Sequence, residues 1–193
     1  MTFFNCYKDV HVQSLLRKGG NSKMEQRVIE DLVDIYSERL LRYATSILYH
    51  HQDAEDVVQD VFMSAYQNWS TFDGKNISAW LYKITYNKSI NKLKKRKILF
   101  FADAPDIRVE QQNQPHFSEE TLIALGKLKP QERAILYGRI IEGYDYEELA
   151  EQMGASPATL RKRYERAKKK FAGILNHGHQ TITPKEEIIY EKL

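Results

Sequence analysis

The most informative segment of the chain is YEELAEQMGASPATLRKRYERAKKK, which spans residues 146–170. Residues 146–153 have the apolar spacing of a short amphipathic helix, with Leu149 directed inward. Gly154 permits a tight backbone turn, and Ser156 followed by Pro157 suits the first turn of a second helix. The segment therefore predicts a helix-turn-helix.

The helix after this turn is strongly basic on its outward face. Leu160, Tyr164 and Ala167 recur at helical spacing and should pack inward, which leaves mainly lysines and arginines outside. A run of cations on a helix is often only a solvated surface, but here it follows a turn in the correct register. A recognition helix in a DNA major groove needs this combination, so the motif predicts DNA binding.

Residues of this helix are expected to have separate roles. Its first turns would enter a groove most deeply, so we expect Lys162, Glu165 and Arg166 to reach base edges. Arg166 can bridge two acceptors of a guanine, and Glu165 can accept a hydrogen bond from a cytosine amine. The remaining candidates for DNA contact are Ser156, Thr159, Arg161, Arg163 and Lys169. Of these, we assign Arg161, Arg163 and Lys169 to the phosphates.

The whole chain is expected to be all-α. Three further amphipathic helices are predicted in its first half, at about residues 28–48, 53–69 and 76–97, and Asp53 suits the N-cap of the second. The stretch that follows them holds Pro, Asp, Gln and Asn without periodicity, as a flexible linker does. The predicted organisation is an N-terminal extension (1–23), a helical domain (24–98), a linker (99–117), a second helical domain (118–175) and a tail (176–193).

Composition limits the classes of protein that need be considered. The chain has 193 residues, of which 28% are charged and 42% hydrophobic, a mixture typical of globular proteins. Its net charge of +3 is too small to identify a polyanionic partner. Cys6 is the only cysteine, which excludes an intrachain disulfide and favours a cytoplasmic location. We expect no membrane insertion, because the sequence shows neither an export signal nor an apolar run of bilayer-spanning length.

The second and third predicted helices carry opposite charge. Asp56, Gln59 and Asp60 share one face of the second helix, which is either a solvated surface or the contact site of a basic partner. The third helix has many lysines and no acidic residue from Lys83 onward, and it also carries aromatic rings such as Trp80. Cations and rings together suit single-stranded DNA, although the rings are equally compatible with a core.

These features resemble the extracytoplasmic-function sigma factors, a subfamily of the sigma-70 family of bacterial RNA polymerase sigma factors. The resemblance rests on two blocks of residues that occur in the expected order. The first block, similar to sigma region two, comprises DAEDVVQDVF at 53–62 and AWLYKI at 79–84 with Asn87. The second, similar to sigma region four, comprises LKPQER at 128–133, GYDYEELA at 143–150 and SPATLR at 156–161, with Arg166 and Ala167.

The resemblance implies a promoter-recognition subunit without catalytic activity or a cofactor of its own. Its main partner would be core RNA polymerase, through the β′ clamp helices and the β flap, with Asp56, Gln59 and Asp60 on the clamp helices. The helix-turn-helix would bind the −35 duplex of promoter DNA, and an anti-sigma factor is a further candidate partner. The residues implied for the unpaired −10 strand are Phe72, Asp73, Lys75, Asn76, Lys83, Asn87 and Lys88.

Three other classes of protein compete with this interpretation. An enzyme would need a phosphate-binding loop, a nucleophile elbow or paired metal ligands, and the sequence contains none of these motifs. The paired histidines at 50–51 lack further ligands, so no metal site is predicted. A polymerase-independent helix-turn-helix regulator is the main alternative, and it would use its N-terminal half to sense a ligand or to dimerise. A pure protein-interaction module leaves the basic helices unexplained.

Overall fold

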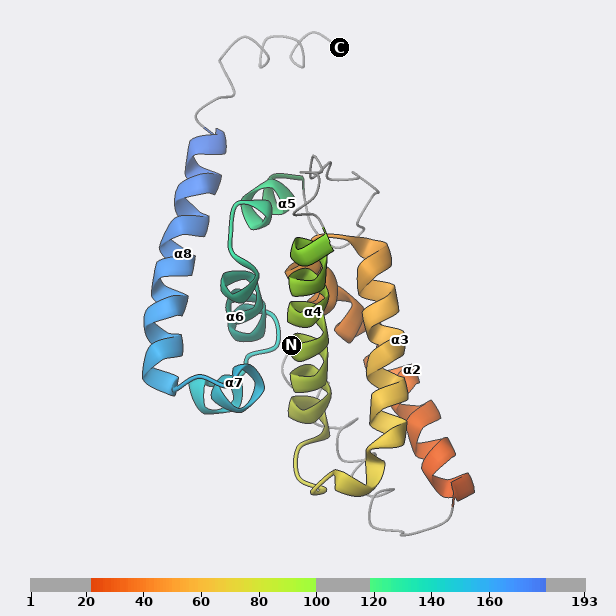
Figure 1. Ribbon diagram of the computed structural model, residues 1–193. Helices are drawn as coiled ribbons and strands as arrows, with labels where there is room; N and C mark the ends of the chain where they lie inside the picture. Colours follow the sequence, from red (N-terminus) through yellow and green to blue (C-terminus); the bar gives the residue numbers. More distant parts are fainter. Residues whose placement is uncertain (1–21, 100–118, 180–193) are drawn as a thin grey trace, which may run out of the picture.

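The protein is all-α in the computed structural model, which describes residues 22–99 and 119–179 (Figure 1). Within these ranges the chain forms helices and no strand, which confirms the expected fold class. The expected extension, linker and tail lie mainly outside the described residues, although the last described helix continues past residue 175 to His179. No helix in the described ranges is long and apolar enough to cross a membrane. The elements are α2 (Ser22–Leu48), α3 (His51–Gln67), the 3-10 helix η1 (Trp69–Thr71), α4 (Ile77–Leu99), α5 (Glu119–Gly126), α6 (Pro130–Ile140), α7 (Tyr146–Met153) and α8 (Pro157–His179).

Helices α2, α3 and α4 pack against one another as a three-helix bundle (Figure 1). Each helix contributes apolar residues at helical spacing, as the sequence predicts. Helix α2 fully buries Leu32, Tyr36, Leu40 and Ile47, and Leu81 of α4 is equally buried. The apolar residues that recur at helical spacing along α3 are all buried, namely Ala54, Val57, Val58, Val61, Phe62 and Ala65.

The start of α3 differs from the sequence prediction. The helix begins at His51 and its N-cap is His50, whose ring Nδ1 accepts a hydrogen bond from the backbone N–H of Asp53 at 3.2 Å. The prediction of Asp53 as the N-cap is therefore wrong, because a histidine nitrogen satisfies the free amide that an aspartate oxygen was expected to satisfy. Asp53 lies in the first helical turn instead, where the helix dipole also favours a carboxylate.

The first helices of the C-terminal half follow local signals in the sequence. Pro130 occupies the first turn of α6, where its missing N–H costs nothing. Helix α6 ends at Ile140, and the turn that follows contains Gly143 at a φ of +74°. Asp145 then caps α7 by accepting the backbone N–H of Glu148 at 2.8 Å. The Asp145 cap therefore sets the start of the helix-turn-helix segment at residue 146.

The turn between α7 and α8 has the geometry that the sequence predicts. Gly154 ends α7 at a φ of +63°, in the left-handed region that glycine adopts without strain. The Ser156 hydroxyl accepts the backbone N–H of Thr159 at 3.3 Å and so caps α8. Leu160 and Ala167 are fully buried on the inner side of α8. The helix-turn-helix is therefore present as expected.

The two groups of helices share one hydrophobic core and lie in direct contact. Helix α6 packs against α2, and α7 packs against α4 (Figure 1). The ring of Tyr43 on α2 lies 4.9 Å from that of Tyr82 on α4 and 5.4 Å from that of Tyr137 on α6. The sequence predicted both groups of helices, but it gave no sign of this contact between them.

Replacement of Gly154 by valine should destabilise the helix-turn-helix. A β-branched residue is strained at this positive φ, so the free energy of unfolding should fall by about 1–2 kcal/mol. The Gly173→Ala variant is the matched control, because Gly173 lies inside α8 and a Cβ there meets no atom within 4 Å. That change should raise stability by up to about 1 kcal/mol. Urea unfolding followed by circular dichroism measures both, and equal stability of Gly154→Val and the parent would contradict the assignment of the turn.

Candidate functional site

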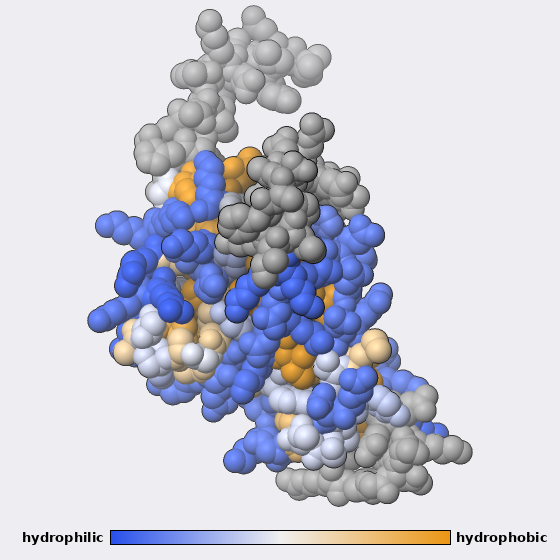
Figure 2. Space-filling view, viewed as in Figure 1, coloured by the Kyte–Doolittle hydropathy of each residue, from blue (hydrophilic) through white to orange (hydrophobic). Residues whose placement is uncertain are grey.

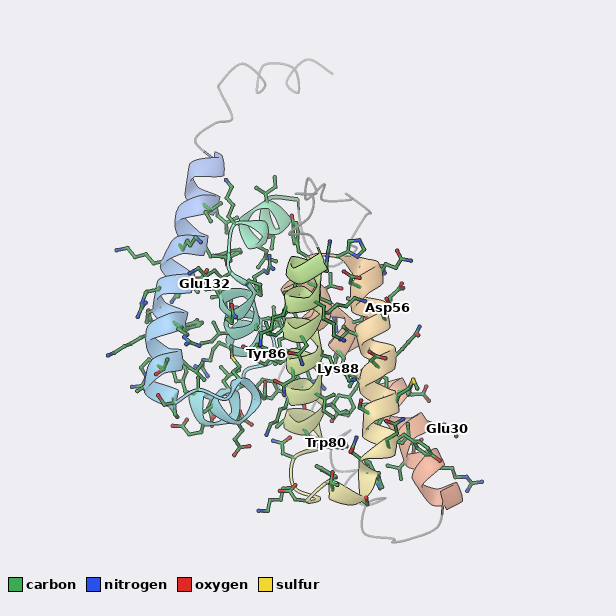
Figure 3. All side chains as sticks on the ribbon, viewed as in Figure 1. Glu30, Asp56, Trp80, Tyr86, Lys88 and Glu132 are labelled. Atoms are coloured by element: carbon green, nitrogen blue, oxygen red, sulfur yellow. The ribbon has the colours of Figure 1, made fainter. Side chains whose placement is uncertain are left out.

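The exposed face of α3 carries the acidic residues that the sequence singles out. Asp56, Gln59 and Asp60 are all exposed, and they lie together because residues three and four apart are neighbours on a helix. The opposite side of α3 is buried against α2 and α4. Figure 3 shows Asp56 in the half of α3 nearest its start. The helix therefore presents these side chains to solvent as one strip.

Asp56 is already paired, because α4 supplies a cation to this end of the strip. The ammonium of Lys92 lies 2.8 Å from a carboxylate oxygen of Asp56 and 3.1 Å from one of Asp53. Arg96 lies 2.9 Å from Asp53. Burial lowers the pKa of Lys92, but hydrogen bonds to Asp56 and Asp53 outweigh this effect and raise it above its usual value. These pairs connect α3 to α4, whereas Asp60 forms no ion pair with the described residues.

The acidic strip continues into two exposed apolar residues that the sequence analysis missed. The side chains of Met63 and Tyr66 are 60% and 50% exposed. Both lie on the side of α3 that carries Gln59 and Asp60, at intervals of three or four residues. Apolar anchors beside polar residues are typical of protein contact surfaces. The helical period of the sequence contained this signal, because residues 56, 59, 60, 63 and 66 form one continuous row. We call Gln59, Asp60, Met63 and Tyr66 the α3 strip.

Three aromatic rings gather at the start of α4. The ring centroid of Phe72 lies 4.9 Å from that of Trp80, and the centroid of Trp69 lies 5.7 and 6.1 Å from these two. All three side chains are half-buried, so each keeps part of its ring surface exposed. The cluster therefore anchors the loop at 72–76 to α4 and leaves aromatic surface on which a nucleobase can stack.

The polar residues of the loop at 72–76 stabilise its conformation. The side chain of Asp73 accepts the backbone N–H of Lys75 at 3.1 Å, and the side chain of Asn76 accepts that of Ala79 at 2.9 Å. Asn76 therefore acts as the N-cap of α4 in addition to any contact with a ligand. Asp73, Lys75 and Asn76 are exposed beside the aromatic cluster.

Helix α4 presents lysines to solvent and tyrosines to the rest of the protein. Lys83 and Asn87 are exposed on successive turns, whereas Lys88 is half-buried and lies on the side toward α3 (Figure 3). Tyr82 and Tyr86 are buried, with exposed fractions of 0% and 8%. In this arrangement these two tyrosines belong to the core and offer no surface for base stacking. The stacking surface of the N-terminal half is instead the cluster around Trp80.

Every residue predicted to contact duplex DNA is exposed, either at the start of α8 or on its first turns. Hydrophilic residues cover much of the surface over this helix (Figure 2). The guanidinium of Arg161 lies 5.2 Å from the ring centroid of Tyr146 on α7, so the first helix of the motif orients the second. The candidates, all exposed, are Ser156, Thr159, Arg161, Lys162, Arg163, Glu165, Arg166 and Lys169.

The described residues offer no candidate metal site. Between residues 22 and 99 and between 119 and 179, no group of three or more His, Cys, Asp or Glu side chains could hold an ion. His51 interacts with a carboxylate of its own helix, since its Nε2 lies 3.4 Å from Glu55. His50 serves as the cap of α3.

Comparison with protein families matches the two halves of the chain separately. The family Sigma-70 region 2 matches residues 32–98, and the family Sigma-70, region 4 matches residues 119–171. The RNA polymerase sigma factor YlaC of Bacillus subtilis is 30% identical over 151 residues, which cover 72% of this chain and 87% of YlaC. The ECF RNA polymerase sigma factor SigW of the same organism is 35% identical over 83 residues, 42% of this chain and 44% of SigW. SigE of Mycolicibacterium smegmatis is 24% identical, and the match covers 79% of this chain and 63% of SigE. The matches to SigW and SigE thus span less than two thirds of those proteins.

Solved structures with the same fold include two complexes. The sigma factor RpoE of Bartonella quintana, solved with the anti-sigma factor NepR, aligns with a TM-score of 0.67 at 24% identity. This match covers 76% of the present chain and 96% of RpoE. CnrH, solved with the cytosolic domain of CnrY, aligns with a TM-score of 0.60 at 26% identity over 89% of this chain and 96% of CnrH.

Single-stranded DNA should quench the tryptophan fluorescence of this protein. The sequence contains 2 tryptophans, and both belong to the aromatic cluster beside the loop at 72–76. A base that stacks on this cluster should lower the emission, and Lys83→Ala should raise the oligonucleotide concentration required by about threefold to tenfold. Lys127→Ala, an exposed lysine change outside the two basic helices, is the control. Binding detected by mobility shift without any change in emission would place the strand elsewhere.

Proposed function

Because the chain belongs to the extracytoplasmic-function sigma factors of the sigma-70 family, we propose that it directs core RNA polymerase to a specific set of promoters. The observation that supports this function most directly is that one chain carries the α3 strip and two separate basic surfaces. The first surface lies beside the loop at 72–76 and suits single strands, whereas the second, on α8, suits a duplex groove. A polymerase-independent regulator is not favoured, because the N-terminal half matches sigma region 2 over residues 32–98.

We infer that the α3 strip binds the β′ clamp helices of the polymerase. Asp60 supplies a carboxylate that the protein itself leaves unpaired among the described residues, and Met63 and Tyr66 supply apolar anchors. Asp56, which the sequence analysis placed in this contact with Gln59 and Asp60, is held by Lys92. A basic partner would have to compete with Lys92 for Asp56, so we assign the larger share of binding to Asp60 and the two anchors.

In the same proposal, the unpaired −10 strand binds along the loop at 72–76 and the exposed side of α4. The aromatic cluster offers a stacking surface for a base that has left the duplex, and Lys75 and Lys83 are exposed for its backbone. Asp73, Asn76 and Asn87 supply exposed polar groups that can distinguish bases. Lys88 would contact the strand only at its edge, because it lies toward α3.

Region 4 is proposed to read the −35 duplex and to contact the β flap. Arg166, Glu165 and Lys162 are assigned to base edges, and Arg161, Arg163 and Lys169 to phosphates. For the flap we propose the exposed end of α6, where Ile140 and Ile141 are 58% and 56% exposed. The protein would supply specificity and stabilise the melted strand, while the polymerase catalyses nucleotidyl transfer.

We propose that the protein acts in the cytoplasm, where bacterial transcription takes place. CnrH was solved with a bound partner, the cytosolic domain of CnrY. By analogy, an anti-sigma protein is a candidate inhibitor of this chain.

The experiment that tests the function is transcription with purified components. Core RNA polymerase freed of sigma factors is mixed with this protein and a pool of genomic fragments, and the 5′ ends of the transcripts are sequenced. The proposal predicts a small set of start sites that share upstream elements. No initiation above that of core polymerase alone, with folded protein and the cognate core, would favour the operator-binding alternative.

Substitutions in the α3 strip should weaken binding to core polymerase. Asp60→Ala and Tyr66→Ala should each raise the dissociation constant about tenfold, and Asp56→Ala, just outside the strip, should have a smaller effect because of its pair with Lys92. Ile123→Ala on α5 is the matched control, since Ile123 is an apolar residue that is 49% exposed. Fluorescence anisotropy of the labelled protein titrated with core measures all four. An equal effect of Ile123→Ala would show that the strip has no special role.

Two substitutions on α8 should separate base reading from phosphate contact. Arg166→Ala should lose about 1–3 kcal/mol of discrimination at one base pair of the −35 element. Lys169→Ala should instead weaken binding to all duplexes alike and reduce the slope of log K against log salt by about one. Competition binding with a library of −35 duplexes at several salt concentrations measures both effects. The reverse pattern would exchange the roles assigned to Arg166 and Lys169.

A further inference from the structure

The two halves of the protein are joined by a half-buried ion pair. Arg39 on α2 donates a hydrogen bond to Glu142, in the turn after α6, at 2.5 Å. These residues are 103 positions apart in the sequence, and their side chains are only 18% and 5% exposed. A charge pair at this depth is strongly coupled, since removal of one partner leaves the other buried without compensation.

Aromatic side chains from both halves surround this pair. The guanidinium of Arg39 lies 5.3 Å from the ring centroid of Tyr36 and 6.0 Å from that of Tyr82. The ring of Tyr82 in turn meets that of Tyr144, two residues after Glu142, at 5.3 Å. The hydroxyl of Tyr144 also lies 2.6 Å from that of Ser78 on α4. The turn at 142–144 is therefore held between α2 and α4.

A second arginine connects the halves at the other end of α2. Arg133 on α6 is 6% exposed and donates a hydrogen bond to the backbone carbonyl of Ile47 at 2.6 Å. Its other terminal nitrogen donates to the carbonyl of Leu125 at 3.3 Å. Burial lowers the pKa of Arg133 to about 10, so the group still carries its charge at neutral pH. Two of the connections between the halves thus depend on guanidinium groups, one half-buried and one buried.

The contact between the halves also contains polar groups that it does not satisfy. The hydroxyls of Tyr43 on α2 and Tyr137 on α6, whose rings meet across the halves, are buried without a hydrogen-bond partner among the described residues. Such groups cost free energy when buried and regain hydrogen bonds to water when exposed. A contact of this composition resembles an interface that separates more than it resembles a permanent core.

This arrangement is too compact to hold both promoter elements at once. Helix α7 packs on α4 on one side and on α8 on the other, so two interaxial steps of about 10 Å separate the two DNA-binding helices. Elements centred at −10 and −35 lie about 25 base pairs apart, or about 85 Å along straight DNA. The closeness of the two helices is also evident from Arg163 of α8, whose charge lowers the pKa of Tyr86 on α4, against the larger opposite effect of burial.

We propose that the Arg39–Glu142 ion pair is a latch that keeps the free protein in this closed arrangement. The closed state holds region 4 on the inner side of α4, and it must open before the −10 and −35 elements can be bound together. A partner that binds the separated halves shifts the population toward the open state by its preference for that state. The role of the latch in transcription rests on the proposed function, but the existence of the latch does not.

Distance measurements between the halves test the latch. In the full chain with Cys6→Ser, cysteines at Gln67 on α3 and Glu151 on α7, both exposed, carry a donor and an acceptor dye. Single-molecule energy transfer should give mainly one high-efficiency population for the parent. Arg39→Glu should raise the low-efficiency fraction relative to the closed one by about tenfold or more. The charge-swapped pair Arg39→Glu with Glu142→Arg should restore most of the closed population.

Two controls make the result specific. Asp34→Lys reverses a charge on another exposed residue of α2 and should leave the populations unchanged. If Arg39→Glu fails to fold by circular dichroism, Glu142→Gln removes the charge with little change of shape and gives the same test. Unchanged populations in a folded Arg39→Glu or Glu142→Gln variant would overturn the latch, as would a swap that stays open.

The transcription assay separates the latch from the proposed function. With core polymerase and DNA that carries the −10 and −35 elements present, the parent should move to the low-efficiency population. The Arg39→Glu variant should reach that population at a lower concentration of core polymerase. An opened variant that shows the expected energy transfer but directs no initiation would leave the latch in place and count against the function. Energy transfer that stays high in the initiating complex would overturn the requirement for opening.

Discussion

Burial of the apolar side of α2 is the constraint on which the rest of the structure depends. Tyr36, Tyr43 and Ile47 are fully buried, and α2 packs against α3, α4 and α6. Each large apolar side chain that α2 removes from water contributes about 1.5–3 kcal/mol to the free energy of folding. One amphipathic helix of this length can therefore hold several neighbouring helices in place. Helices α3 and α4 are placed by this contact, and α6 carries the helix-turn-helix to the opposite side. The positions of both candidate DNA-binding surfaces therefore follow from one helix.

The charged residues near this core divide into internal and external groups. Asp53 and Asp56 pair with Lys92 and Arg96, so their charges connect α3 to α4. Asp60, on the next turn of the same helix, is exposed toward solvent. Ion pairs that are exposed or partly exposed contribute little to stability, usually less than about 1 kcal/mol, so the pairs between α3 and α4 align these helices more than they stabilise them. The strip that remains outside combines one charge with Met63 and Tyr66, which suits a partner with both basic and apolar groups.

The contact between the halves differs in chemistry from the core of either half. Aliphatic residues fill most of the interior of the three-helix bundle, whereas Arg39, Glu142, Arg133 and several tyrosines lie between α2, α4 and the C-terminal helices. Half-buried charges of this kind stabilise one arrangement less than a hydrophobic interface of equal size would, because desolvation offsets much of their attraction. Such a contact can be unique in the closed state and still separable. A protein that holds its two DNA-binding helices together in a closed state and separates them in an open state needs both properties.

The sequence by itself determined the local structure of this protein and the identity of its surfaces. The period of the apolar residues predicted the helices, and Gly154, Ser156 and Pro157 predicted the turn and the start of α8, because these signals act between residues a few positions apart. The family resemblance added the candidate residues of α3, α4 and α8. Only the tertiary structure decided that Tyr82 and Tyr86 lie in the core, that Lys92 holds Asp56, and that Arg39 meets Glu142. Those outcomes depend on which helix faces which, and a pattern along one helix contains no information about the side chains that another helix brings to it.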